Sequence, residues 1–116
     1  MSDLSNIENL NEINNFFLQA KDETSKYNWY SAIELLKKIE KFSIDGNLKK
    51  IEGEVCYKLG EIYHIASQYE DNEENVLEFL RIATKYFQKA QNIFQERFEI
   101  HRMFESYEKI YHALIQ

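Results

Sequence analysis

Apolar residues recur every three or four positions along most of the chain, which is the spacing of one buried face on an amphipathic α-helix. Five such stripes follow one another, over residues 4–20, 32–42, 48–69, 76–94 and 100–114. The pattern therefore predicts five helices.

The segments between the stripes indicate where helices begin and end. The sequence has no proline and only three glycines, which leaves little material for the turns of an all-β fold. The segments KYNW (26–29), SIDGN (43–47) and YEDNEEN (69–75) combine Asn, Asp and Gly where backbone groups need a cap or a turn. We interpret the acidic run in the third segment as a cap and a solvated turn, with a docking site for a basic partner as the alternative.

No comparable signal stands near Arg97, so a break there and a nearly continuous helix both remain open. We predict one all-α domain over residues 1–116, with five antiparallel helices stacked as hairpins. The first hairpin spans about 4–43, the second about 47–96, and a terminal helix about 98–115.

Gly60 lies inside the segment YKLGEIY, which otherwise has a strong helical pattern. A glycine in the middle of a helix costs about 0.5–1 kcal/mol relative to alanine. Its presence predicts that a neighbouring helix approaches so closely that a β-carbon would not fit.

The hairpin around this glycine resembles a tetratricopeptide (TPR) repeat, in which a small residue on the first helix lets the second approach. The matching positions are Leu59, Gly60 and Tyr63 in the first helix and Ala83, Phe87 and Ala90 in the second. In this arrangement, Phe87 is expected to fill the gap between the small positions.

The resemblance is strong in this hairpin and looser in the rest of the chain. Twenty-three residues separate Gly60 from Ala83, whereas the family pattern has about twelve. The difference of about eleven residues is close to three helical turns. The same faces of the two helices are therefore expected to meet in the longer hairpin. Such lengthened repeats also resemble the SNAP-type membrane-fusion adaptors.

The TPR resemblance implies a non-enzymatic adaptor that holds a helical or extended segment of a partner protein in an inner groove. Transferred position by position, the groove residues would be Asn14, Phe17, Lys21, Thr24, Glu54, Tyr57, Glu61, His64, Arg102, Glu105, Lys109 and His112. Phe17 and Tyr57 would be its aromatic anchors. Ordinary solvated helix surface with partly buried aromatics is the alternative for the same residues.

TPR domains that bind chaperones hold a terminal carboxylate with lysine and asparagine side chains. Glu54, Tyr57 and Glu61 occupy the corresponding positions here, so a co-chaperone function is not expected.

Charge and composition narrow the partners further. Twenty acidic and fourteen basic residues give a net charge of −6, which disfavours nucleic acid and anionic lipid as partners. No stretch approaches the roughly 18 apolar residues of a membrane span, so no direct membrane insertion is expected. A single cysteine, Cys56, suits a reducing compartment, and we expect a cytoplasmic protein.

The sequence carries no glycine-rich phosphate loop, paired metal cysteines or serine elbow, so we predict neither an enzyme nor a cofactor. Cys56 is interpreted as an inert core residue. Glu61 and His64 have the Glu-x-x-His spacing of di-iron bundles, but that motif must occur twice. Glu108 and His112 have the wrong spacing, so a metal-binding bundle is a minor alternative.

The last stripe is broader than one packing face. Its apolar residues are Phe104, Tyr107, Ile110, Tyr111, Leu114 and Ile115. A second copy of the chain or a partner is one possible cover for this surface, which would make the protein a homodimer through its last helix. Packing against the preceding hairpin is the other.

Overall fold

The computed structural model describes the backbone of residues 2–96 and 100–115 and the side-chain surroundings of residues 10–96 and 105–115. These residues form α1 (Ser2–Ser25), α2 (Trp29–Asp45), α3 (Lys49–Ser67), α4 (Glu73–Glu96) and α5 (Ile100–Ile115). No strand occurs in these ranges. The predicted all-α fold with five helices is confirmed.

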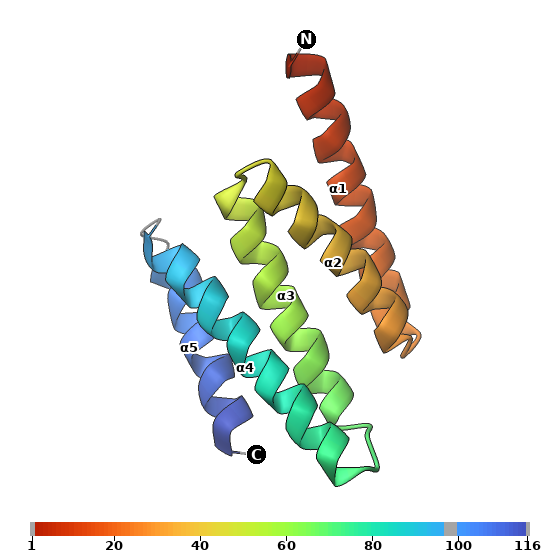
Figure 1. Ribbon diagram of the computed structural model, residues 1–116, viewed down its shortest axis with the longest axis vertical. Coiled ribbons are helices and arrows are strands. Elements are labelled where there is room, and N and C mark those ends of the chain that lie inside the picture. Colours follow the sequence, from red (N-terminus) through yellow and green to blue (C-terminus); the bar gives the residue numbers. More distant parts are fainter. Residues whose placement is uncertain (1, 97–99, 116) are drawn as a thin grey trace.

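Each helix packs against the next one in chain order, and α3 also contacts α5. In Figure 1, α3 and α4 lie at the centre, α1 and α2 form one flank, and α5 returns alongside α4. The alternative of one nearly continuous helix through Arg97 is therefore wrong. The narrower prediction, that the helices stack as TPR hairpins, remains a prediction.

The contact between α3 and α4 depends on two glycines. A β-carbon on Gly60 would lie 2.5 Å from ring carbons of Phe87, and one on Gly53 would lie 2.7 Å from Phe94. Real β-carbons do not approach other atoms so closely, so the glycines make room for these rings. The predicted close approach of a second helix at Gly60, with Phe87 filling the space, is confirmed. The pairs also show that residue numbers rise along α3 as they fall along α4.

The turn from α1 to α2 is a Schellman motif with an unusual residue at its left-handed position. Tyr27 has φ 64°, and its N–H donates to the Thr24 carbonyl at 3.0 Å. The Asn28 N–H reaches back to the Glu23 carbonyl at 2.9 Å. This position is usually glycine, because a β-carbon is strained there.

The turn from α2 to α3 repeats the same geometry twenty residues later. Asn47 has φ 54°, and its N–H donates to the Ile44 carbonyl at 3.1 Å. The Leu48 N–H donates to the Ser43 carbonyl at 2.8 Å. The sequence signal SIDGN correctly predicts this turn, but Asn47 rather than Gly46 takes the left-handed conformation.

The acidic segment before α4 is a helix cap, as predicted. The side-chain carbonyl of Asn72 accepts hydrogen bonds from the N–H groups of Glu74 at 2.8 Å and Asn75 at 3.3 Å. Glu73 and Glu74 lie in the first turn, where carboxylates favour the positive end of the helix dipole.

Candidate protein-interaction surfaces

Part of the predicted groove comes together between α1 and α3. Phe17, Lys21 and Thr24 from α1 and Glu61 from α3 line one cavity there. The Thr24 hydroxyl is occupied, because it donates to the Ala20 carbonyl at 2.7 Å. The cavity has a volume of about 150 Å³. Ligand pockets usually measure about 300–1,000 Å³, so this space is too small for a series of partner side chains.

Tyr57 is not an exposed anchor, contrary to the prediction. Its side chain is 8% exposed, and its ring packs against Phe87 with the centroids 5.8 Å apart. Helical spacing places Tyr57 on the face that turns toward α4, which is why it belongs to the core. The other predicted groove residues of α3, Glu54 and His64, are half-buried, and Asn14 on α1 is exposed.

The predicted residues of α5 whose side chains are described do not line the cavity between α1 and α3, because α5 packs mainly on α4. Glu105 and Lys109 are half-buried. His112 is exposed, with its Nε2 3.7 Å from a Glu108 oxygen. The side chain of Arg102 lies outside the described residues.

A large apolar cleft lies between α1 and the α2–α3 turn. Its walls include Leu10 and Phe16 of α1, Phe42 of α2 and Leu48, which precedes α3. Its volume is about 920 Å³. In Figure 1, α1 and α2 meet at the turn that joins them and diverge toward the N-terminus of α1.

The rim of this cleft is charged. Lys38 and Lys41 project from α2, whereas Glu12 lies on α1 and Asp45 at the end of α2. The Lys38 ammonium lies 5.9 Å from the centre of the Phe16 ring, within the range of a cation–π contact. An apolar floor with a polar rim is the usual anatomy of a protein-binding site.

The sequence did not single out this cleft. Phe16 and Phe42 belong to regular apolar stripes, which predict burial against a neighbouring helix. Both are only partly buried, because their two helices diverge. The available signal was the run of lysines between residues 37 and 50 in an otherwise acidic chain.

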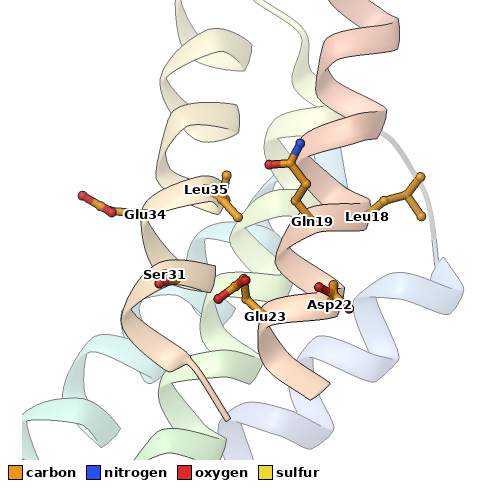
Figure 2. Close-up of a pocket in the computed structure, with 7 residues that line it drawn as sticks. All are labelled: Leu18, Gln19, Asp22, Glu23, Ser31, Glu34 and Leu35. Carbon is orange, nitrogen blue, oxygen red and sulfur yellow. The ribbon is translucent and has the colours of Figure 1, made fainter. Parts of the chain in front are cut away.

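A second depression, between α1 and α2, is polar. It measures about 500 Å³, and Asp22 and Glu23 on α1 and Glu34 on α2 are among its lining residues (Figure 2). Asp22 forms an ion pair with Lys26 at 3.0 Å, and Glu23 accepts a hydrogen bond from Asn28 at 3.0 Å. These carboxylates stabilise the α1–α2 turn locally.

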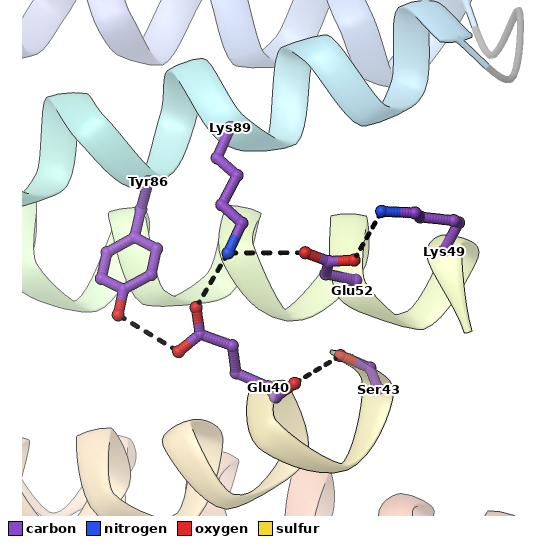
Figure 3. Close-up of polar contacts among 6 residues, drawn as sticks. All are labelled: Glu40, Ser43, Lys49, Glu52, Tyr86 and Lys89. Carbon is purple, nitrogen blue, oxygen red and sulfur yellow. Dashed lines mark hydrogen bonds and ion pairs between the residues drawn. The ribbon is translucent and has the colours of Figure 1, made fainter. Parts of the chain in front are cut away.

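A polar network connects α2, α3 and α4 (Figure 3). The Lys89 ammonium lies 3.3 Å from a Glu40 oxygen and 3.4 Å from a Glu52 oxygen. Tyr86 donates its hydroxyl to Glu40 at 3.3 Å, and Lys49 donates to Glu52 at 3.3 Å. Burial, together with the nearby Glu40 carboxylate, raises the pKa of Tyr86 well above its usual range. The two glutamates thus share the Lys89 ammonium, while Glu40 also binds the Tyr86 phenol and Glu52 also binds Lys49.

Cys56 lies next to this network and is fully buried, as predicted for a core cysteine. Burial raises the pKa of its thiol to about 12, although the Lys89 charge acts in the opposite direction. The thiol is therefore protonated at neutral pH, and a protonated buried thiol is a poor nucleophile.

Three aromatic rings meet at the opposite end of the molecule from the cleft. The Tyr27 ring lies 5.6 Å from Trp29 and 5.7 Å from Tyr69, and Trp29 lies 5.4 Å from Tyr69, all between centroids. The rings join the α1–α2 turn to the residues that follow α3. Tyr27 and Tyr69 nevertheless remain largely exposed.

The outer face of α5 is also apolar. Ser106, Ile110 and Ala113 are buried or half-buried, whereas Tyr107 and Tyr111 are exposed on the adjacent stripe. Leu114 and Ile115 extend this exposed stripe. The broad apolar surface that the sequence predicts for the last helix is therefore present. One stripe of it is packed and the adjacent stripe faces solvent.

The described residues offer neither a ligand set for a metal ion nor a membrane-spanning helix. No three His, Cys, Asp or Glu side chains gather there in a way that could hold a metal ion. None of the helices in those ranges has the length and apolar character needed to cross a bilayer.

Comparison of the chain with protein-family models, with curated proteins and with solved structures finds no match. The TPR resemblance consequently remains a prediction from the residues quoted above.

Proposed function

We propose that this protein is a non-enzymatic interaction module that binds a segment of a partner protein in the cleft between α1 and the α2–α3 turn. The observation that carries the proposal is the cleft itself. It has apolar walls from two diverging helices, a volume of about 920 Å³ and a charged rim. An apolar cleft of this size stays solvated only at a cost in free energy, which a partner's side chains would remove.

Binding energy would come from a few apolar anchors of the partner placed against Phe16, Phe42 and Leu48, with the rim charges setting specificity and association rate. The interior supports a non-enzymatic role, because the buried Cys56 thiol is protonated and the network around Lys89 is internally paired. A TPR-like adaptor in the cytoplasm, where a lone cysteine stays reduced, fits these features.

Two leucines on α1 provide a matched test. Leu10 lies on the cleft wall and is 44% exposed, whereas Leu18 lies outside the cleft, lines the polar depression and is 65% exposed. A photo-crosslinking amino acid at position 10 would first identify a partner, whose affinity is then measured with the purified proteins. We expect Leu10→Asn to weaken binding by about tenfold or more, the loss of one buried anchor, and Leu18→Asn to change it by less than about twofold. Equal affinities for the two variants would remove the cleft from the proposal.

A second candidate function is self-association through α5. Tyr107, Tyr111 and Leu114 have the i, i+4, i+7 spacing of a helix-packing stripe, and all three are exposed. Sedimentation equilibrium of the native protein and of Leu114→Glu tests this. A dimer that the substitution dissociates would support the second candidate, and a monomer at high concentration would reject it.

A further inference from the structure

We infer that the segment bound in the cleft is an amphipathic helix with acidic residues along the edge that faces α2. This inference rests on the proposed function, because it names the chemistry of the partner for the same cleft. Its support comes from the backbone of the walls, from the apolar residues of the floor and from the charges on the rim.

The walls of the cleft favour a helix over an extended peptide. The wall residues from α1 and α2 lie on regular helices, whose backbone N–H and C=O groups already bond to each other. An extended peptide on apolar side chains would find no backbone partners, and unpaired backbone groups in a desolvated site are costly. A helix satisfies its own backbone and offers only side chains to the walls.

The floor of the cleft is apolar and comes from more than one element. Phe16 and Phe42 come from two helices that diverge, and Leu48 lies beyond them at the α2–α3 turn. Apolar side chains at positions i, i+3 or i+4, and i+7 of a helix form one stripe that can pack against these apolar residues.

The charges on the α2 side select acidic partners. Residues 37–50 contain five lysines against Glu40 and Asp45, a local balance of +3 in a chain of net charge −6. Two of these charges are already compensated, because Glu40 is paired with Lys89 and Lys49 is paired with Glu52. Among the described residues, no ion pair is found for Lys38 or Lys41 on the rim.

The opposite rim differs in sign, which gives the bound helix an orientation. Glu12 lies on the α1 side, so an acidic edge would be repelled there and attracted by Lys38 and Lys41. Asp45 lies at the end of α2 and disfavours acidic residues at that end of the cleft. The inference therefore specifies acidic residues on one edge of the partner helix.

A display library of amphipathic helical peptides, with varied apolar faces and randomised edge positions, tests this inference. The library is selected on the native protein and, in parallel, on the Leu10→Asn variant as a cleft control. We expect the native protein to enrich Asp and Glu at one edge by about tenfold over Lys and Arg, a modest factor for two close charge pairs.

The charge-reversed variant Lys38→Glu/Lys41→Glu should instead enrich Lys and Arg at the same edge. A matched control, Lys58→Glu/Lys85→Glu, changes the net charge equally at exposed residues of α3 and α4 and should keep the acidic preference. Circular dichroism of all variants would establish that they remain folded.

The outcomes separate the two proposals. Cleft-dependent peptides without an acidic preference, or a preference that Lys38→Glu/Lys41→Glu leaves unchanged, would overturn the acidic helix but keep the cleft as a binding site. Selection that does not depend on Leu10, or no selection at all, would overturn both. Dimerisation that Leu10→Asn abolishes would place a second copy in the cleft and also overturn the inference.

Discussion

Gly60 shows how the absence of one side chain sets the distance between two helices. The Phe87 ring occupies the position that a β-carbon would need, and the ring is completely buried. A buried ring cannot move aside without disturbing its other neighbours, because protein interiors are packed as densely as organic crystals. The same reasoning applies to Gly53 and Phe94 one heptad away.

We predict that Gly60→Ala lowers the free energy of unfolding by about 1–3 kcal/mol through overpacking, although alanine favours the helix itself. Urea denaturation measures this change. Gly46→Ala is the control, since a β-carbon there would meet its nearest atoms at 3.3–3.5 Å, and its effect should be smaller. Equal stability of Gly60→Ala and the native protein would contradict the close contact.

Tyr27 adopts a left-handed backbone conformation that a residue with a β-carbon disfavours. Its positive φ would suit glycine, yet a tyrosine occupies the position and packs its ring against Trp29 and Tyr69. A left-handed conformation costs a non-glycine residue about 1–2 kcal/mol. The ring contacts therefore offset part of a local strain.

Two substitutions at this position isolate the backbone contribution, because both remove the ring. We predict that Tyr27→Gly is more stable than Tyr27→Ala by about 1 kcal/mol. At the exposed Lys37 inside α2 the order should reverse, with Lys37→Ala more stable than Lys37→Gly by about 1 kcal/mol. Thermal denaturation of the four variants checks both signs, and the same order at both positions would contradict the left-handed assignment.

At the scale of elements, the network around Lys89 connects three helices that apolar packing alone would bring together less specifically. Glu52 is only 5% exposed and depends on Lys89 and Lys49 for its countercharge. Removing one member of such a group is costly, because it leaves a buried charge with less compensation.

We predict that Lys89→Met destabilises the protein by about 1–3 kcal/mol, because Glu40 and Glu52 lose their shared cation. The control is Lys26→Met, which breaks the solvent-exposed pair with Asp22 and should cost less than about 1 kcal/mol. Guanidinium denaturation compares the two. A similar small loss in both variants would show that the network does not stabilise the helix contacts.

At the scale of the whole molecule, backbone amides should be best protected from hydrogen exchange in α3 and less protected in the outer helices. This helix contacts α2, α4 and α5, whereas α1 packs mainly against α2. Local opening costs least where an element has few buried neighbours. An outer helix that opens easily would also let the cleft between α1 and α2 adjust to an incoming segment.

Hydrogen exchange followed by mass spectrometry tests this order. We predict the slowest exchange in peptides from the middle of α3, with exchange at least tenfold faster in peptides from α1, a difference of about 1.4 kcal/mol in opening free energy. Uniform exchange across both helices would indicate a single cooperative unit and contradict the outward gradient.

Local signals in the sequence were sufficient for part of this description. The helical period predicted five helices, Asn and Asp predicted the turns and the cap of α4, and Gly60 predicted the close approach of a second helix. That Phe87 fills the space there was expected from the TPR resemblance. Each of these depends on residues within a few turns of one another or on the space left by a missing side chain. Such features are determined by covalent geometry, backbone hydrogen bonding and steric fit.

Only the tertiary structure decided which apolar faces are covered. It buried Tyr57 against α4, placed the described side chains of α5 away from the cavity between α1 and α3, and left Phe16 and Phe42 beside an open cleft. A stripe of apolar residues specifies that a helix has a packing face, but the angle between two helices depends on side chains from both. The divergence of α1 from α2, and with it the candidate binding site, arises from that pairing.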